Sequence, residues 1–224
     1  MTEESLLLAT TNQGKIKELK ARLNSPTLGI FSLKDIHPIK IFPEKGETFS
    51  ENARGKSLFY SQYWEHLTLA EDSGLEVDYL KGAPGVYSSR FAGPDATDEE
   101  NLQKVLHLLD DVPLEKRKAR FVSCMVLSCK GQVLAEIQEH AEGSITQKKR
   151  GHRGFGYDPI FFYPPLGLLR FYWDLLQREF NAYLYAIYYH ISPIYTRIFY
   201  SIAWMYWDSK RIVFQSPKFC FSGF

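Results

Sequence analysis

The chain has 224 residues, and its 27 Lys and Arg against 26 Asp and Glu give a formal net charge of +1 at pH 7. This near balance argues against the long basic track of a protein that binds nucleic acid, so we expect any anionic ligand to be held locally. Three cysteines without a CxxC pair argue against a disulfide framework and against a four-ligand zinc site. The first residues, MTEESLLLATTNQGK, lack the basic start of a signal peptide. We therefore expect a cytoplasmic protein.

The two parts of this chain differ in their content of aromatic residues. Of its 34 aromatic residues (16 Phe, 14 Tyr and 4 Trp), 16 lie in residues 1–163 and 18 in the 61 residues that follow. Pro164-Pro165 ends any preceding element at this break. We expect one catalytic domain over residues 1–166 and an atypical aromatic-rich segment over residues 167–224.

The first part of the chain alternates between short apolar runs and helical patterns. Residues 5–10 form an apolar run that ends in small polar residues, which predicts a strand. After a loop, residues 16–23 repeat apolar side chains at helical spacing, and residues 48–63 do the same. We expect a strand, a helix and a second helix, in that order.

The middle of the chain predicts more strands. We expect a short strand at 67–70, a break at Glu71-Asp72-Ser73-Gly74 and an alternating strand at 75–79. Thr97 with Glu100 three residues later forms a capping box for a helix to about residue 110.

A long hairpin completes the pattern. Residues 119–128 and 132–143 are joined by Lys130-Gly131, and their β-branched and aromatic residues favour strands. A last strand is expected at 160–163. Strands alternating with helices predict an α/β fold with a mixed sheet.

Thr10-Thr11-Asn12-Gln13-Gly14-Lys15 is a turn from a strand into a helix. A helix N-terminus offers free N–H groups and partial positive charge to a phosphate, and Lys15 adds a full charge. The alternative interpretation is a capped helix with a solvated lysine.

The second motif runs from Glu44 to Ala53 and is followed by Lys56. Acidic residues in a first helical turn usually only complement the helix dipole. Taken alone, this motif favours a structural interpretation.

Glu71-Asp72-Ser73-Gly74 is the third motif, with two acids that follow an apolar run. Adjacent carboxylates at a strand end suit Mg²⁺, which binds through one or two carboxylates together with substrate phosphates. A structural turn is the alternative.

Gly151 to Pro159 is a glycine-rich loop with aromatic and acidic side chains. Phe155 could stack on a base, and Asp158 could accept a hydrogen bond from a ring N–H or an exocyclic amine. A tight turn before the last strand is the alternative.

In this order and spacing, the motifs resemble the inosine triphosphate pyrophosphatase family, also called XTP/dITP diphosphatases. The resemblance covers residues 5–166 and favours this family over the related septum-formation pyrophosphatases. It rests on TTNQGKIKEL, FPEKGETFSENARGK, LAEDSGLEVDYLKGAPGVYSSRFAG, DATDEENLQKVL, KARFVSCMVL and GFGYDPIFF.

The resemblance implies a Mg²⁺-dependent enzyme that hydrolyses deaminated purine nucleoside triphosphates such as ITP, dITP and XTP. The products are the monophosphate and pyrophosphate, and the reaction keeps these nucleotides out of nucleic acids. The implied fold is an elongated mixed sheet flanked by helices, with a cleft between two lobes, usually in a homodimer.

Roles for individual residues follow from the same resemblance. Asp72 matches the general base and a metal ligand, and Glu44 matches a second metal-binding acid. Glu71 stands where the family often has an aspartate. The positions that match substrate contacts are Thr10, Thr11, Asn12, Gln13, Gly14, Lys15, Lys56, Ser73, Phe155, Gly156, Tyr157 and Asp158.

The resemblance stops after Gly167. The family's SxxEKNxxSHR-like motif, which supplies a lysine, a histidine and an arginine that close over the base, is absent from the sequence. We hypothesise a change of reading frame near this codon or a substituted terminus. Two alternatives stay open: a nucleotide-binding protein without turnover, and a membrane attachment through residues 180–207, which Pro193 and Arg197 disfavour.

Overall fold

The computed structural model describes residues 4–23, 28–36, 40–150, 155–163 and 168–169. In this part of the chain, one seven-stranded sheet has the order β2-β1-β3-β4-β5-β6-β7. The strands are β1 (Glu4–Leu8), β2 (Leu28–Ser32), β3 (Leu67–Val77), β4 (Lys118–Cys129), β5 (Gln132–Ile145), β6 (Phe161–Tyr163) and β7 (Leu168–Leu169). β1 pairs in parallel with β2 and β3, and the other neighbours are antiparallel. The expected mixed sheet is confirmed.

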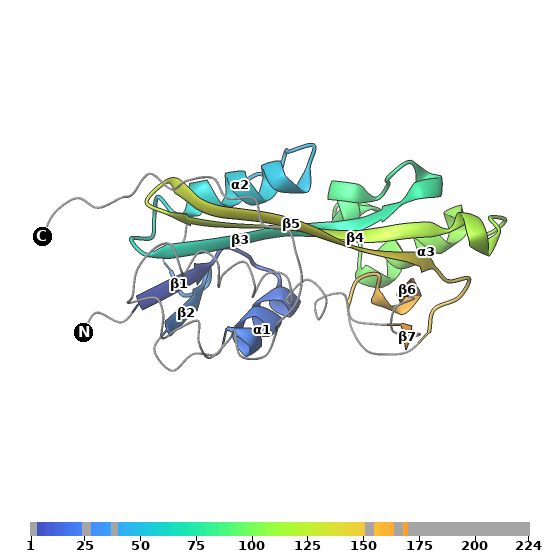
Figure 1. The fold of residues 1–224 in the computed structure, drawn as a ribbon, viewed down its shortest axis with the longest axis horizontal. Coiled ribbons are helices and arrows are strands. Elements are labelled where there is room, and N and C mark those ends of the chain that lie inside the picture. The colour runs from blue at the N-terminus through green and yellow to red at the C-terminus, as the bar shows by residue number, and fades with distance from the viewer. Residues whose placement is uncertain (1–3, 24–27, 37–39, 151–154, 164–167, 170–224) are drawn as a thin grey trace, which may run out of the picture.

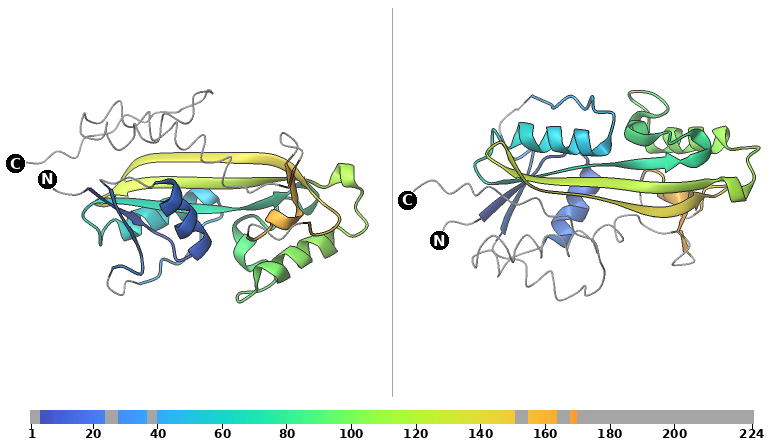
Figure 2. Two further views of the ribbon diagram at one scale, coloured as in Figure 1. Left: turned by 90° about the horizontal axis from the view of Figure 1, so that it is seen from below. Right: turned by 45° about the horizontal axis from the view of Figure 1, so that its top comes forward.

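Three long strands, β3, β4 and β5, form a spine with a group of elements at each end. Figure 1 shows β1, β2 and α1 (Gln13–Arg22) near one end, with α2 (Phe49–Tyr60) over the opposite face of the spine. At the other end lie α3 (Asp98–Leu108), β6 and β7, and both views of Figure 2 show the same division. The molecule therefore has two lobes on one elongated sheet.

Side-chain caps fix where α2 and α3 begin. The Thr48 side chain accepts a hydrogen bond from the Glu51 N–H at 3.1 Å. Thr97 accepts one from the Glu100 N–H at 3.2 Å, and the Glu100 carboxylate accepts one from the Thr97 N–H at 2.7 Å. These bonds satisfy N–H groups that have no partner within the helix. The predicted capping box is confirmed.

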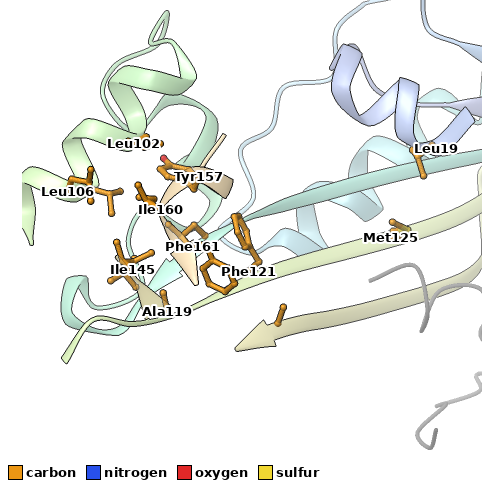
Figure 3. Packing of buried hydrophobic residues seen from close by; sticks show 14 of the residues in the cluster. Leu19, Leu102, Leu106, Ala119, Phe121, Met125, Ile145, Tyr157, Ile160 and Phe161 are labelled. Atoms are coloured by element: carbon orange, nitrogen blue, oxygen red, sulfur yellow. The ribbon is translucent and has the colours of Figure 1, made fainter. Parts of the chain in front are cut away.

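The core of the second lobe packs α3 and the 157–161 segment against the spine (Figure 3). The rings of Phe121 in β4 and Phe161 in β6 lie 4.7 Å apart between centroids. Leu102 and Leu106 of α3 belong to the same buried cluster. Burying each such side chain stabilises the fold by about 1.5–3 kcal/mol.

The hairpin turn is as predicted, because Lys130 and Gly131 both have positive φ, at 47° and 75°. Other boundaries differ. Helix α2 ends at Tyr60 rather than near residue 63, and β2 and a 3₁₀ helix at Gly85–Arg90 have no predicted counterpart.

The break expected at residues 71–74 is wrong, because β3 runs through it without interruption. Asp72 pairs with Cys124 and Gly74 with Val122 in the β3–β4 ladder. Gly74 marks a close approach rather than a turn, since a Cβ there would lie 2.3 Å from the Ser88 Oγ. The two acids therefore project from the middle of a strand.

Within the described residues, no helix has the length and apolar character that crossing a membrane requires. The proposed span at residues 180–207 lies outside this part of the chain, as does Cys220. Burial raises the pKa of the Cys124 thiol to about 12.

Candidate active site

A cavity of about 430 Å³ has walls from both lobes. Residues predicted for the site that line it are Thr10, Thr11, Asn12, Lys15, Glu44, Lys56, Asp72, Ser73, Phe155, Gly156, Tyr157 and Asp158. Gln13 and Gly14 belong to the same loop but do not line the cavity. Motifs more than 140 positions apart in sequence therefore meet around one space.

Hydrogen bonds within the 10–15 loop shape the start of α1. The Thr10 Oγ1 accepts from the Asn12 N–H at 3.2 Å, and the Asn12 Oδ1 accepts from the Lys15 N–H at 3.1 Å. The Gln13 amide donates to the Thr11 carbonyl at 3.1 Å. The Asn12 side chain is thus the helix cap, and the loop is ordered by its own side chains.

Lys15 reaches from this loop to a buried carboxylate. Its Nζ lies 2.5 Å from the Glu71 Oε2, and the Ser123 hydroxyl donates to the Glu71 Oε1 at 3.0 Å. Burial by itself lowers the pKa of Lys15. The attraction of Glu71, then of Asp72 and Glu44, outweighs burial, so the Lys15 pKa is raised above its ordinary value. Lys15 is therefore a firmly charged ammonium.

Lys56 comes from the buried face of α2, which also carries Phe49 and Ala53. Its ammonium forms an ion pair with the Glu44 carboxylate and donates to the main-chain oxygen of Glu71 at 3.1 Å. Lys56 is only 8% exposed. The spacing of Lys56 from Phe49 and Ala53 places it on the apolar face of the helix, and this pattern in the sequence could have indicated that Lys56 is buried.

Asp72 is a buried carboxylate whose hydrogen-bonding capacity is not fully used. It is 8% exposed, and its Oδ2 has no hydrogen-bond partner among the described residues. Burial raises the pKa of Asp72 to about 6, although Lys56 and Lys15 oppose the shift. A buried carboxylate with an unsatisfied oxygen is suited to bind a cation or to accept a proton.

Glu44 and Asp72 are the acids that could hold a metal at this cavity. Within the described residues, no group of three or more His, Cys, Asp and Glu side chains could hold a metal ion. Mg²⁺ often binds through one or two carboxylates together with substrate phosphates. Two acids and an unpartnered buried Asp72 oxygen fit an ion that is shared with the substrate.

Residues 155–158 form another part of the cavity wall. The Phe155 N–H donates to the Asp158 Oδ2 at 3.1 Å, and the Gly156 N–H donates to the Asp98 Oδ2 at 2.8 Å. The Phe155 ring lies against Gly14, because a Cβ there would approach its Cδ1 to 3.4 Å. Two carboxylates thus hold the main chain of this loop.

Tyr157 anchors the same loop to the Gly85–Arg90 helix. Its hydroxyl donates to the Ser88 carbonyl at 2.7 Å, and burial, together with Asp98, raises the pKa of Tyr157. The Ser88 Oγ in turn accepts from the Leu75 N–H of β3 at 2.9 Å. The Tyr157 hydroxyl is therefore engaged in holding the loop to the spine.

The sequence profile of the Ham1 family matches residues 6–172. The chain belongs to the Ham1 family. It is 42% identical to the dITP/XTP pyrophosphatase of Bacillus licheniformis over 158 residues. The aligned region covers 70% of this chain and 81% of that protein. The dITP/XTP pyrophosphatase of Photobacterium profundum is 43% identical over 161 residues, which cover 71% of this chain and 81% of that protein.

Solved structures of the Ham1 family share the fold. The Staphylococcus aureus Ham1 protein matches with a TM-score of 0.65 and 36% identity, over 73% of this chain and 83% of that chain. A nucleoside-triphosphatase / dITP/XTP pyrophosphatase of Mycobacterium abscessus matches with a TM-score of 0.62 and 36% identity, over 74% and 86% of the two chains. The family resemblance and its fold are confirmed.

Sequence reasoning missed several residues of the cavity wall in this Ham1-family chain. Ser88 and Ser89 line it, and so does Asn101 of α3. The Asn101 amide donates to the Ser89 carbonyl at 3.2 Å, and its Oδ1 accepts from the Ala92 N–H at 2.7 Å. Asn101 is buried beside Leu102 on one face of α3, a pattern that could have identified it. The serines follow no periodic pattern.

Proposed function

We propose that this Ham1-family chain is a hydrolase of acid anhydrides that converts dITP, XTP and ITP to the monophosphate and pyrophosphate. The observation that carries the proposal is one cavity whose wall holds Lys15, Lys56, Glu44 and Asp72 together with the 155–158 loop. Its volume of about 430 Å³ lies in the range of small-molecule sites. Relatives named as dITP/XTP pyrophosphatases support the substrate class.

The triphosphate binds at the end formed by the 10–15 loop. The N-terminus of α1 supplies N–H groups and partial positive charge, and Lys15 and Lys56 supply full charges. Because both ammonium groups are largely buried, their attraction to phosphate is weakly screened by water. Ser73 lies on the same wall and contributes a hydroxyl.

The purine binds at the other end. Phe155 offers a ring on which a base stacks, and base stacking on an aromatic side chain contributes about 1–3 kcal/mol. Gly156 lets the main chain adopt a left-handed conformation here, since its φ is 57°. Asp158 and Tyr157 complete this wall.

Asp72 acts as the general base. One of its carboxylate oxygens accepts a proton from the attacking water or orients that water toward the phosphorus. Glu44 and Asp72 are the proposed Mg²⁺ ligands. When bound, Mg²⁺ neutralises phosphate charge and lowers the pKa of water. Lys15 and Lys56 stabilise the charge that develops on the departing pyrophosphate.

The assembly and setting of the protein belong to the same proposal. We expect a cytoplasmic homodimer that acts on free nucleotides, with no nucleic-acid partner, and a catalytic domain over residues 1–166. These expectations come from the family resemblance and the sequence composition. Sedimentation equilibrium of the full chain tests the dimer, and a monomer at micromolar concentration contradicts it.

Pyrophosphate release from a panel of nucleotides tests the function. With Mg²⁺ present, we expect release from dITP, XTP and ITP, much slower release from dATP and dGTP, and none after chelation with EDTA. Equal release from dGTP and dITP contradicts the proposed selectivity. Binding without release supports the alternative of a nucleotide-binding protein, which the names of the relatives do not favour.

A further inference from the structure

Lys56 contacts one of the two carboxylates that are proposed to hold the metal. Its ammonium forms an ion pair with the Glu44 carboxylate and donates to the Glu71 carbonyl at 3.1 Å. It also attracts the charge of Asp72 more strongly than any other group does. Carboxylate and carbonyl oxygens are the ligands of hard cations, so Lys56 and a divalent cation require the same partners.

The charged side chains around Lys56 include more carboxylates than ammonium groups. Three carboxylates, Glu44, Glu71 and Asp72, lie with the ammonium groups of Lys15 and Lys56. Each lysine is paired with one carboxylate, and Asp72 is left with a buried oxygen that has no hydrogen-bond partner among the described residues. The cluster therefore attracts one more cation, but Lys56 already holds Glu44.

A divalent cation and an ammonium group repel each other when buried at one site. Metal binding to Glu44 and Asp72 therefore requires Lys56 to leave Glu44. In the free protein the displaced ammonium keeps only the neutral Glu71 carbonyl among its described partners, whereas a bound triphosphate offers charged oxygens on the same cavity wall.

We propose that Lys56 is a resident counter-ion of the metal site, which suppresses metal binding until phosphates draw its ammonium away from Glu44. Metal and nucleotide therefore bind together rather than one after the other. This inference rests on the proposed function, because it takes the phosphates of that substrate as the new partners of Lys56. It assigns a second role to a residue whose expected role is phosphate contact.

The test measures metal affinity without turnover. Mn²⁺ serves as a probe for Mg²⁺, and electron paramagnetic resonance at room temperature counts the free ion during titration of the nucleotide-free full chain. We expect Lys56→Met to bind Mn²⁺ at least about tenfold more tightly than wild type, because a nearby charge shifts such an equilibrium by about one to three powers of ten. Lys56→Gln carries the same expectation if the methionine variant folds poorly.

Three controls isolate the Lys56 contact. Lys56→Arg keeps the charge and should bind Mn²⁺ as weakly as wild type. Lys45→Met removes an exposed lysine next to Glu44 that forms no ion pair with any described residue, and its affinity should change less than about twofold. Adding Glu44→Gln to Lys56→Met should abolish the gain.

The inference is overturned if Lys56→Met and Lys56→Gln bind Mn²⁺ no more tightly than wild type, or if Lys45→Met gains as much. Circular dichroism and thermal melting confirm that each variant is folded. The outcome is separable from the proposed function: a gain in Mn²⁺ affinity in a chain that releases no pyrophosphate supports the counter-ion role and rejects the enzyme assignment.

Discussion

Two groups of residues that line the cavity, which we call the phosphate end and the purine end, differ in how their polar groups are satisfied. At the phosphate end, the largely buried Lys15 and Lys56 form ion pairs with Glu71 and with the partly exposed Glu44, and Asp72 keeps an unsatisfied oxygen. At the purine end, the loop is held by hydrogen bonds that are already made, such as that from the Tyr157 hydroxyl to the Ser88 carbonyl.

This contrast predicts different effects of substitutions at the two ends. The phosphate end keeps electrostatic interactions that a ligand can rearrange, so substitutions there should change turnover more than folding. The purine end is preorganised by satisfied bonds, so substitutions there should change binding and stability together.

The largest expected effect is on turnover at the phosphate end. Asp72→Asn keeps the size of the side chain but removes the base and a metal ligand, and we expect turnover of dITP to fall by about 10²–10⁴-fold. Binding of dITP, measured by calorimetry, should be retained within about tenfold, because the lysines and the purine end are intact. Turnover within tenfold of wild type contradicts the role of Asp72.

The same substitution should stabilise the fold in a pH-dependent way. The pKa of Asp72 is raised from 3.8 to about 6 in the folded chain. Below pH 4 both the folded and unfolded states keep the proton, and above pH 6 both lose it. As the pH rises through this window, the buried charge of Asp72 lowers the free energy of unfolding. The loss reaches about 3 kcal/mol and remains at higher pH.

Urea unfolding of wild type and Asp72→Asn at pH 4 and pH 7.5 measures this effect. The variant should gain free energy of unfolding relative to wild type at pH 7.5 and gain little at pH 4. Equal differences at the two pH values would show that the folded-state pKa of Asp72 is not raised.

At the purine end, Phe155→Ala should weaken dITP binding by about 1–3 kcal/mol, because a base loses its stacking partner. We expect KM to rise with little change in kcat, since the charged end is untouched. Phe155→Tyr is the matched control, because it keeps the ring. A fall in kcat with KM unchanged contradicts the assignment of Phe155 to the base.

The smallest effect is expected at Tyr157. Tyr157→Phe removes the hydrogen bond to the Ser88 carbonyl and keeps the ring, so the free energy of unfolding should fall by about 1 kcal/mol. Thermal denaturation measures this change, and KM for dITP should rise only slightly. No loss of stability would show that the hydroxyl does not hold the loop.

Local signals predicted much of this fold. The capping box at Thr97 and Glu100 gave the start of α3, and Lys130-Gly131 gave the hairpin turn. These features depend on neighbours in sequence, which is why a single chain suffices to identify them. That the 10–15 loop and the 155–158 loop share a site was implied only by the family resemblance.

Long-range packing could not be predicted in the same way. The local sequence predicts a break that includes Gly74, whereas in the fold its lack of a side chain permits the close approach of Ser88. Lys56 and Asn101 lie in the buried stripes of α2 and α3, where their polar groups meet partners from other elements. Such contacts depend on the tertiary arrangement, and residues 170–224 lie outside the described chain.

The products of dITP hydrolysis test the central claim most directly. Chromatography of a reaction with the full chain and Mg²⁺ should show dIMP and pyrophosphate in equal amounts, and the reaction with Asp72→Asn should show neither above background. Formation of dIDP and orthophosphate, or no product from the folded wild-type chain, would contradict the claim that this cavity cleaves deaminated purine triphosphates to the monophosphate.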